Sequence, residues 1–311
     1  MAEWRAVLGR VRQSEVVQSF LASRGTLAAA LAIMLAALAI MLASLCAGLI
    51  APHDPFDPAT LWLQDALKPP AWLPKGEWRF PLGTDVLGRD VWSALLYGSR
   101  LSLIIGFSAV ALSLTIGVTL GLIAGYRGGV IDVLIMRLAE VQLSLPTILV
   151  ALLINGLLRA VAPPHLIDRL AVAVLILSIG LSQWVQFARA VRASTLVERG
   201  QEYVLAARLI GLRDVTIMFR HVLPNVLSPV FVIATLNLAG AILSEASLSF
   251  LGVGVPPTQP SLGTLISKGA EYLFSGAWWI VVFPGAALAA LSLSVNLVGD
   301  WLRDTLNPVL D

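Results

Sequence analysis

The sequence predicts an all-α membrane protein with six transmembrane helices, an external cap segment after the first helix and a cytoplasmic loop before the fifth. Of its 311 residues, 58% are hydrophobic and 13% are charged, and the charged share is about half that of a soluble domain. Six apolar stretches approach or exceed the roughly 20 residues that a helix needs to cross a bilayer. Lipid is therefore the solvent that the surplus apolar surface requires.

The six expected spans are separated by connections that hold most of the charged side chains. They cover residues 27–50, 101–126, 141–158, 170–188, 222–244 and 272–299. Pro146 interrupts the third span and Gln183 the fourth, but proline is tolerated where neighbouring helices satisfy the freed carbonyl. The resulting division is a cytoplasmic segment 1–26, the first helix 27–50, an external cap segment 51–100, a five-helix core 101–299 that includes a loop at 189–224, and a cytoplasmic tail 300–311.

The basic residues indicate the orientation of the chain. If the N-terminus is inside, most of the 21 Lys and Arg residues fall in cytoplasmic connections. Connections rich in Lys and Arg stay in the cytoplasm, and long loops count less in this rule. We therefore expect both termini in the cytoplasm, with the proline-rich cap segment and the charged loop on opposite faces of the membrane.

The cytoplasmic loop predicts two short helices. Residues 202–211 read as a helix that ends at Gly211, and 212–223 as a second helix that stops before Pro224. Tyr203, Ala206, Ala207 and Ile210 fall at helical spacing on one face of the first helix. Small residues on an exposed helix favour docking of a cytosolic partner, whereas an amphipathic helix on the inner leaflet is the alternative that the pattern leaves open.

This loop resembles the "EAA" loop of permease subunits of binding-protein-dependent ABC importers. The resemblance is carried by Tyr203, Ala206, Ala207 and Gly211, followed by His221 and Pro224. It implies that the first short helix is a coupling helix, which sits in a groove of an ATPase subunit, and that these six residues form the coupling site. Leu205 stands where the family usually has Glu, so a salt bridge of that Glu is not implied here.

Four further segments resemble the oligopeptide/dipeptide/nickel permease family, and within it the C-type inner-membrane subunit. They are residues 81–90, 97–103, 245–254 and 296–304, and the resemblance covers roughly 20–310. It implies a bacterial inner-membrane permease for di- or oligopeptides or related small solutes. The implied partners are a second permease, two cytosolic ATPases that bind ATP and Mg, a periplasmic or surface binding protein, and membrane lipid.

Several functions are disfavoured by motifs that the sequence lacks. No G-x-x-x-x-G-K-[ST] is present, so we expect the chain to bind no ATP, and H-E-x-x-H and G-x-S-x-G are absent as well. The three histidines lie in different connections, which disfavours a metal site. No run of Lys and Arg could neutralise a row of phosphates, so nucleic acid is not an expected partner. We expect no catalytic residue and no cofactor in this chain.

Polar residues at membrane depth are candidates for the pore or its gate. They are Ser102, Ser108, Thr115, Asn155, Gln183, Asn237 and Glu245. Glu245 is expected to end the fifth span, and bonding to backbone amides of the turn at 252–263 is favoured over a role in transport. Glu140 is expected to pair with Arg137, one turn earlier. An ATP-independent channel or ion-coupled transporter, the alternative function, would need ionisable groups at mid-membrane, for which Glu140 and Glu245 are the candidates.

Four charged residues, Asp85, Arg89, Asp90 and Arg100, cluster before the second span. They are expected to form a salt-bridged knot that anchors the cap, and the alternative is contact with the docked binding protein. Exposed ion pairs contribute about 0–1 kcal/mol each, so an anchoring role requires that the knot be buried.

Overall fold

A computed structural model describes residues 24–55, 63–161, 163, 166–256, 258–259 and 261–306, with the side chains of 24–33, 63, 228–229 and 302–306 left aside. Within this part of the chain the structure is helical, and its one β-bridge joins Thr84 to Asp90. The longer helices are α3 (Arg24–Leu45), α5 (Val91–Arg127), α6 (Gly129–Leu143), α7 (Thr147–Val161), α8 (Ile167–Glu198), α12 (Ser228–Phe250) and α14 (Trp279–Leu306). The shorter ones are α4 (Ala47–Ile50), α9 (Glu202–Leu209), α10 (Asp214–Thr216), the π-helical η4 (Ile217–Val222), α11 (Leu223–Val226) and α13 (Leu262–Ala270), with 3₁₀ turns η2 (Leu63–Asp65) and η5 (Leu273–Ser275).

Among the described residues, four helices are long and apolar enough to cross a membrane, namely α5, α8, α12 and α14. Helices α6 and α7 together make a fifth if the bent pair counts as one span. The expected first span corresponds to α3 and α4. Among the residues with described side chains, its apolar helical part is Met34–Leu45, which is shorter than the four long helices. The expected count of six spans therefore stays a prediction.

Helix α5 begins at Val91, well before the expected start of the second span at Leu101. The reason is a side-chain cap, because the Asp90 carboxylate accepts hydrogen bonds from the backbone amides of Trp92 and Ser93 at 3.3 and 3.0 Å. Such a cap satisfies amide groups that the first helical turn leaves free. The irregular part of the cap segment thus ends at Asp90, and residues 91–100 are helical, while the external location of 51–100 stays a prediction.

The expected third span, 141–158, is broken at Pro146. Helix α6 ends at Leu143, α7 begins at Thr147, and the two axes differ by 99°. Proline lacks the amide proton that would continue the helix, and its ring clashes with the preceding turn. The Gln142 side chain holds the bend against α8, since its amide nitrogen donates to the carbonyl oxygen of Ser182 at 2.8 Å. By contrast, α8 runs through Gln183 without a break.

The fifth and sixth spans begin later than expected. Helix α12 starts at Ser228 rather than Val222 and continues past Glu245 to Phe250. The expected second loop helix does not stop before Pro224, because the segment turns π-helical at Ile217–Val222 and Pro224 then lies in the first turn of α11. Proline fits there because a first helical turn needs no amide donor. Helix α14 starts at Trp279 rather than Tyr272.

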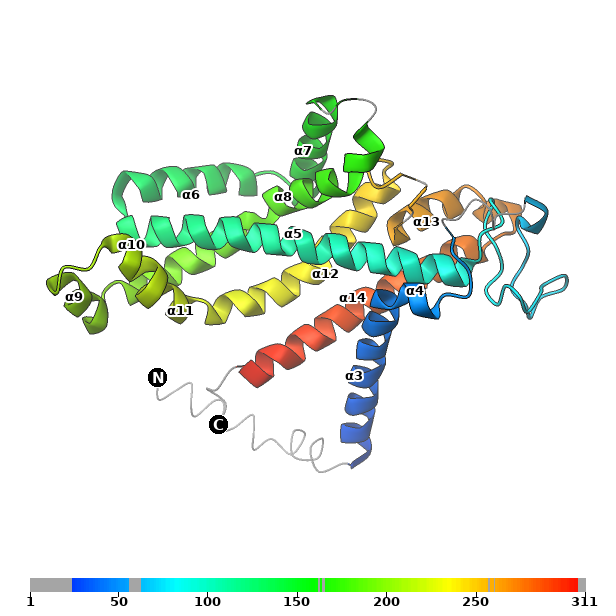
Figure 1. Cartoon of the computed structure of the whole chain (residues 1–311), viewed down its shortest axis with the longest axis horizontal. Helices are drawn as coiled ribbons and strands as arrows, with labels where there is room; N and C mark the ends of the chain where they lie inside the picture. Colours follow the sequence, from blue (N-terminus) through cyan, green and yellow to red (C-terminus); the bar gives the residue numbers. More distant parts are fainter. Residues whose placement is uncertain are drawn as a thin grey trace.

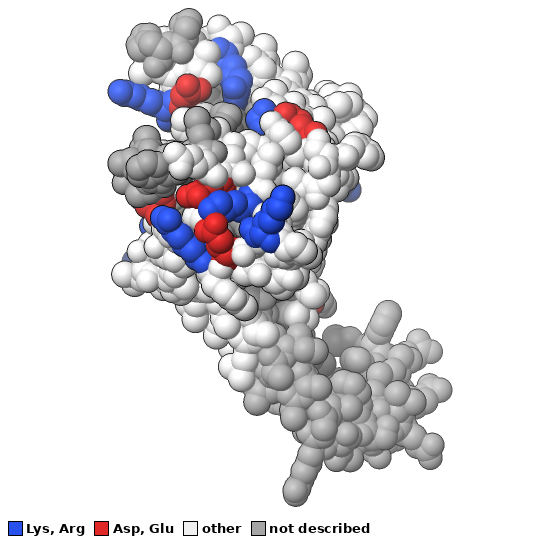
Figure 2. All heavy atoms as spheres, turned by 90° about the vertical axis from the view of Figure 1, so that its right-hand side faces the viewer, with Lys and Arg blue, Asp and Glu red and all other residues white. Residues whose placement is uncertain are grey.

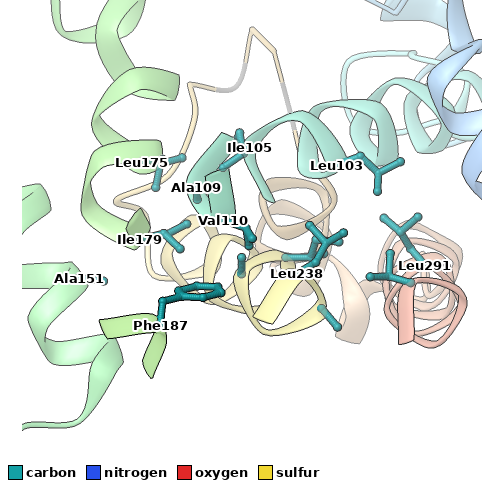
Figure 3. Close-up of a cluster of buried hydrophobic side chains, with 14 of the residues drawn as sticks. Leu103, Ile105, Ala109, Val110, Ala151, Leu175, Ile179, Phe187, Leu238 and Leu291 are labelled. Atoms are coloured by element: carbon teal, nitrogen blue, oxygen red, sulfur yellow. The ribbon is translucent and has the colours of Figure 1, made fainter. Parts of the chain in front are cut away.

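Helices α5, α8 and α12 form the centre of the molecule, and Figure 3 shows their apolar side chains meeting. Glycines permit the close approach of α5 to α8. A Cβ atom on Gly117 would lie 2.5 Å from the Trp184 carbonyl oxygen, and one on Gly121 would lie 2.4 Å from that of Ala188. Helix α9 lies at one end of the long axis, whereas the cap and α13 lie at the other (Figure 1). The cap and the loop thus lie at opposite ends of the long helices, and their placement on opposite faces of a membrane stays a prediction.

Candidate functional site

Helix α9 projects at one end of the molecule (Figure 1). It ends at Leu209, and Gly211, where the sequence predicts the end of the helix, follows two residues later. Gly211 has φ +81° and donates its amide to the carbonyl oxygen of Arg208 at 3.0 Å. A Cβ atom on Gly211 would meet nothing within 4 Å. The glycine is needed there because of its left-handed backbone, which other residues adopt at a cost, and not because of crowding.

The two faces of α9 differ from the expected ones. Val204 and Ala207 are buried against the body, whereas Tyr203 and Ala206 are exposed. The expectation that Tyr203, Ala206, Ala207 and Ile210 share one exposed face was therefore wrong for Ala207. The exposed surface of the loop includes a set of apolar side chains among charged ones such as Arg208 and Arg213. The apolar residues are Leu205, Leu209, Ile210, Leu212, Val215 and Phe219. Leu209 is 89% exposed, so this surface has room for a partner.

Two tyrosines connect the loop to the long helices. Tyr126, at the end of α5, donates from its hydroxyl to Asp214 Oδ1 at 3.0 Å, and the Arg208 guanidinium lies over its ring at 5.1 Å from the centroid. Tyr203 donates to Glu198 Oε2 at the end of α8 at 2.6 Å and accepts from Asn225 Nδ2 at 2.8 Å. Burial, and then the hydrogen bond to Glu198, raise the pKa of the Tyr203 phenol, which therefore stays protonated as a donor.

We call these two sets of tyrosine contacts the tethers. The sequence predicted Tyr203 as a functional residue of the loop, but it did not predict Tyr126 or Asp214. Tyr126 closes the apolar stretch 101–126, so hydropathy gives it no distinct signal, and its partner Asp214 is far away along the chain. The remaining two expected coupling residues, His221 and Pro224, lie in the segment that follows α9. His221 is half-buried in η4, its carbonyl oxygen accepts from Asn225 Nδ2 at 3.1 Å, and Pro224 is exposed.

The structure brings two of the candidate pore residues together, Ser102 of α5 and Glu245 of α12. Both are fully buried, and the Ser102 hydroxyl donates to Glu245 Oε2 at 2.7 Å. Ser249 donates to Glu245 Oε1 at 2.7 Å, and Ser261, which caps α13, donates to the Ser249 hydroxyl at 3.3 Å. The partners of Glu245 are thus hydroxyl groups and not the backbone amides expected at 252–263. The network links α5, α12 and α13, so its role is to hold these helices together.

The other candidate pore residues are separate from one another. Asn155 is buried and donates from Nδ2 to the Val253 carbonyl oxygen at 3.2 Å. Gln183 is buried and donates to the Ser244 hydroxyl at 3.4 Å. Ser108 and Asn237 are half-buried, and Thr115 is exposed. Gln183 Oε1 and Asn237 Nδ2 are buried atoms without a hydrogen-bond partner among the described residues.

At the opposite end, two of the four charged residues expected in the knot, Asp85 and Arg89, form a buried ion pair, and a third, Asp90, caps α5 next to it. Arg89 donates from Nε to Asp85 Oδ2 at 2.8 Å, and Asp85 Oδ1 accepts from the backbone amides of Leu87 and Arg89. Asp85, Arg89 and Asp90 are each less than a tenth exposed. Arg100 is exposed on α5 and lies outside the knot, which corrects its inclusion. Burial makes an anchoring role for the other three physically reasonable.

The knot also borders an open pocket at the cap end of the molecule. A pocket of about 240 Å³ is lined by the knot and by α13, including Lys268, Glu271 and Tyr272. Acidic and basic side chains gather on this end of the molecule (Figure 2), and Lys68 bridges Asp65 and Glu77 there. Trp279 of α14 donates to the Thr84 carbonyl oxygen at 3.1 Å and so fixes the cap to the helices.

Comparison with known proteins extends these observations. Residues 117–311 match the model of the binding-protein-dependent transport system inner membrane component family. The Di/tripeptide transport system permease protein DppC of Pseudomonas aeruginosa (strain UCBPP-PA14) is 41% identical over 297 residues, covering 95% of this chain and 92% of that protein. The Dipeptide transport system permease protein DppC of Haemophilus influenzae is 38% identical over 263 residues, covering 84% and 85%.

A solved structure with a similar fold is an inward-facing conformation of the MetNI methionine ABC transporter. The TM-score is 0.54 at 17% identity, and the match covers 70% of this chain and 97% of that one. At this identity the likeness concerns the fold, whereas the family match and the two relatives extend over most of the chain. The chain therefore belongs to the binding-protein-dependent transport system inner membrane components.

Proposed function

We propose that this chain is the permease subunit of an ATP-driven, binding-protein-dependent importer of di- or oligopeptides or related small solutes. It lies in the bacterial inner membrane as six spans with both termini in the cytoplasm. A second permease completes the path, two cytosolic ATPases bind ATP and Mg, and a periplasmic or surface binding protein delivers the solute. The chain makes and breaks no covalent bond. The relatives named for di- and tripeptide transport support the substrate class.

The exposed apolar surface of α9 is the observation that carries this proposal. Leu205, Leu209 and Ile210 are 48%, 89% and 76% exposed at the tip of the molecule. A concentration of apolar side chains on a projecting helix marks a surface that a partner covers. The occupant we propose is the ATPase, and Leu205, in place of the usual Glu, adds apolar contact where that Glu would add charge.

The tethers give this docking surface a route to the membrane helices. ATP binding closes the two ATPases and moves α9, and Tyr126 and Tyr203 transmit this movement to α5 and α8. The pore then opens toward the outside and receives solute from the binding protein. ATP hydrolysis restores the inward state. Because Val204 and Ala207 are buried against the body, α9 moves together with the segment behind it.

The alternative, an ATP-independent channel or ion-coupled transporter, has less support. Such a protein needs ionisable groups at mid-membrane that can exchange a proton or an ion with water. Glu245 is fully buried among hydroxyl groups, and Glu140 is paired with Arg137 at 2.9 Å. Neither geometry is that of a free ion-coupling carboxylate.

Purification and reconstitution would test the proposal. The tagged chain is extracted in mild detergent from its native membrane, and the proteins that co-purify are identified. The complex is then placed in liposomes with its binding protein, and uptake of a labelled dipeptide is measured with and without ATP. We expect a second permease, ATPases with P-loop motifs, and uptake that requires ATP. Recovery of a homo-oligomer without ATPase even after crosslinking, or uptake driven by an ion gradient alone, would contradict the proposal.

A further inference from the structure

Helix α7 carries a charged side chain, Arg159, that the functional sites above do not include. Its guanidinium donates from Nη2 to the carbonyl oxygens of Val253 and Gly254 at 3.1 and 2.6 Å. Asn155, one turn earlier on α7, accepts from Arg159 Nε at 2.9 Å and donates from Nδ2 to the Val253 carbonyl oxygen at 3.2 Å. We call these four hydrogen bonds the clamp. They join α7 to the turn that follows α12.

The clamp completes the C-terminal end of α12. Gly252, at φ +82°, follows the end of the helix, and the Val253 amide donates back to the Leu248 carbonyl oxygen at 3.1 Å. This turn satisfies a carbonyl group inside α12, whereas the carbonyl groups of Val253 and Gly254 bond to the clamp. A cation suits this position because the C-terminal end of a helix carries partial negative charge. The charge of Arg159 therefore has a physical reason in the turn that it contacts.

The clamp lies at the cap-side boundary of the apolar part of the molecule. Glu245 is level with Ser102, to which it is hydrogen-bonded, and Ser102 is the second residue of the uncharged stretch 101–126 of α5. Helix α12 runs antiparallel to α5, because Ile242 contacts Gly106 further along α5. The turn after α12 thus lies beyond Glu245, toward the cap and the end of the uncharged stretch. The proposed topology places this boundary at the outer surface of the membrane, within reach of water.

Access to water distinguishes the clamp from the neighbouring hydroxyl network of Glu245. Ser102, Glu245 and Ser249 are at most 3% exposed, whereas Arg159 is half-buried. Buried polar groups that separate lose hydrogen bonds that nothing replaces, which is costly. At Arg159 water can replace the hydrogen bonds as they break, because the side chain already reaches the surface. The network is therefore a permanent connection, whereas the clamp can open and close.

Helix α7 is joined to the rest of the molecule in a way that permits movement. The 99° bend at Pro146 separates it from α6, and it stands across the direction of α5 (Figure 1). It packs mainly against α8 and little against α12, and Leu149, Leu153 and Leu157 are more than half exposed. The clamp is thus the main connection between α7 and the end of α12. Opening it would separate the two elements while each helix keeps its internal hydrogen bonds.

We propose that Arg159 and Asn155 are positioning residues of the transport cycle. The clamp holds α7 on the turn after α12 while the cap side of the transporter is closed, and it opens when ATP binding turns the pore toward the outside. Both residues act through α7 and the turn, without contact to the solute. This inference rests on the proposed function and deepens it. Because the clamp stabilises the closed conformation, its removal makes the ATP-driven opening easier.

ATP hydrolysis in the absence of the binding protein tests the clamp. Arg159→Met, which donates no hydrogen bond, is assembled with the second permease and the ATPases in liposomes. Arg169→Met is the matched control, because Arg169 is exposed in the first turn of α8 and forms no hydrogen bond among the described residues. We expect hydrolysis to rise at least about tenfold in Arg159→Met, since hydrogen bonds to a charged group shift an equilibrium by about that factor, and to stay unchanged in the control. An unchanged rate, an equal change in both variants, or a joint loss of assembly and hydrolysis in Arg159→Met alone would contradict the role in the cycle.

Labelling of a buried cysteine provides a second test that leaves Arg159 in place. Cys46, the one native cysteine, is replaced by alanine, and Asn155→Cys is compared with Ser178→Cys. Both positions are fully buried, and the Ser178 hydroxyl bonds within α8, to the Val174 carbonyl oxygen. Each complex is treated with a charged, membrane-impermeant thiol reagent, with and without ATP and vanadate, which hold the ATPases closed. Labelling at 155 should rise at least about tenfold with ATP and vanadate while 178 stays protected, because the reactive thiolate requires water.

Constant protection of the cysteine at 155, or an equal rise at both positions, would overturn the inference. Uptake of a labelled dipeptide by the Cys46→Ala complex, supplied with its binding protein, is measured in the same liposomes. Uptake that does not require ATP would reject the proposed function, and with it a clamp that opens in an ATP-driven cycle. ATP-driven uptake with constant protection at 155 would reject the clamp alone.

Discussion

Replacing Leu209 by alanine should weaken binding of the ATPase without disturbing the fold. Leu209 is 89% exposed at the tip of α9, so it contributes little to the packing of this chain. If the ATPase covers it, the substitution removes three buried carbons, or about 2 kcal/mol at 0.8 kcal/mol per methylene. Since 1.4 kcal/mol corresponds to a factor of ten, the dissociation constant should rise about 30-fold.

The assay is a titration of purified ATPase against the permease pair held in nanodiscs, with bound ATPase measured at each concentration. Phe274→Ala is the matched control, because Phe274 is 98% exposed but lies next to α13 at the cap end. The control should bind ATPase like the unsubstituted chain. An unchanged dissociation constant for Leu209→Ala, or an equal loss in both variants, would refute the assignment of α9 as the docking surface.

Three further substitutions probe the turn, the tether and the helix packing. The Gly211→Val protein should insert into the membrane but lose the ATPase on purification, because a β-branched residue at φ +81° adds about 1–3 kcal/mol of backbone strain. Normal assembly and transport by this variant would count against the reasoning. Tyr126→Phe removes the 3.0 Å hydrogen bond to Asp214 and should lower the peptide imported per ATP hydrolysed while ATPase binding persists, and an unchanged ratio would show that the hydroxyl transmits nothing. Gly121→Leu should lower the free energy of unfolding by about 1–3 kcal/mol or more through overpacking against Ala188, whereas thermal stability in detergent equal to that of the unsubstituted chain would contradict the close approach.

Hydropathy predicted the helical class and most of the span positions, but it missed several of the ends. Helix α5 begins where the Asp90 carboxylate caps it, and a mixed sequence after the cap gives no apolar signal. Pro146 was recognised as an interruption, yet the 99° bend also depends on Gln142, which bonds to α8. These determinants are single side chains with distant partners, so a sliding average over the sequence does not register them.

The candidate site was predictable where its chemistry is local. The turn at Gly211, just after α9, requires a positive φ that glycine adopts at low cost, and the sequence predicted this position. The outward face of α9 was misjudged because helical periodicity places residues on a face without saying which face meets the body. For Glu245, the sequence suggested neighbours in the next turn, whereas Ser102 comes from a helix far earlier in the chain.

Helix α5 joins the two ends of the molecule as one unbroken element. It begins at the Asp90 cap, beside the buried knot, and it ends at Arg127, next to the tyrosine that contacts the loop carrying α9. Its 37 residues form a rod of about 55 Å at 1.5 Å per residue. Because glycines seat this rod against α8, we expect a displacement at the loop to shift the pair of helices as a body. A rigid body of this length carries movement to the cap without a chain of side-chain rearrangements, which is how docking at α9 would reach the external face.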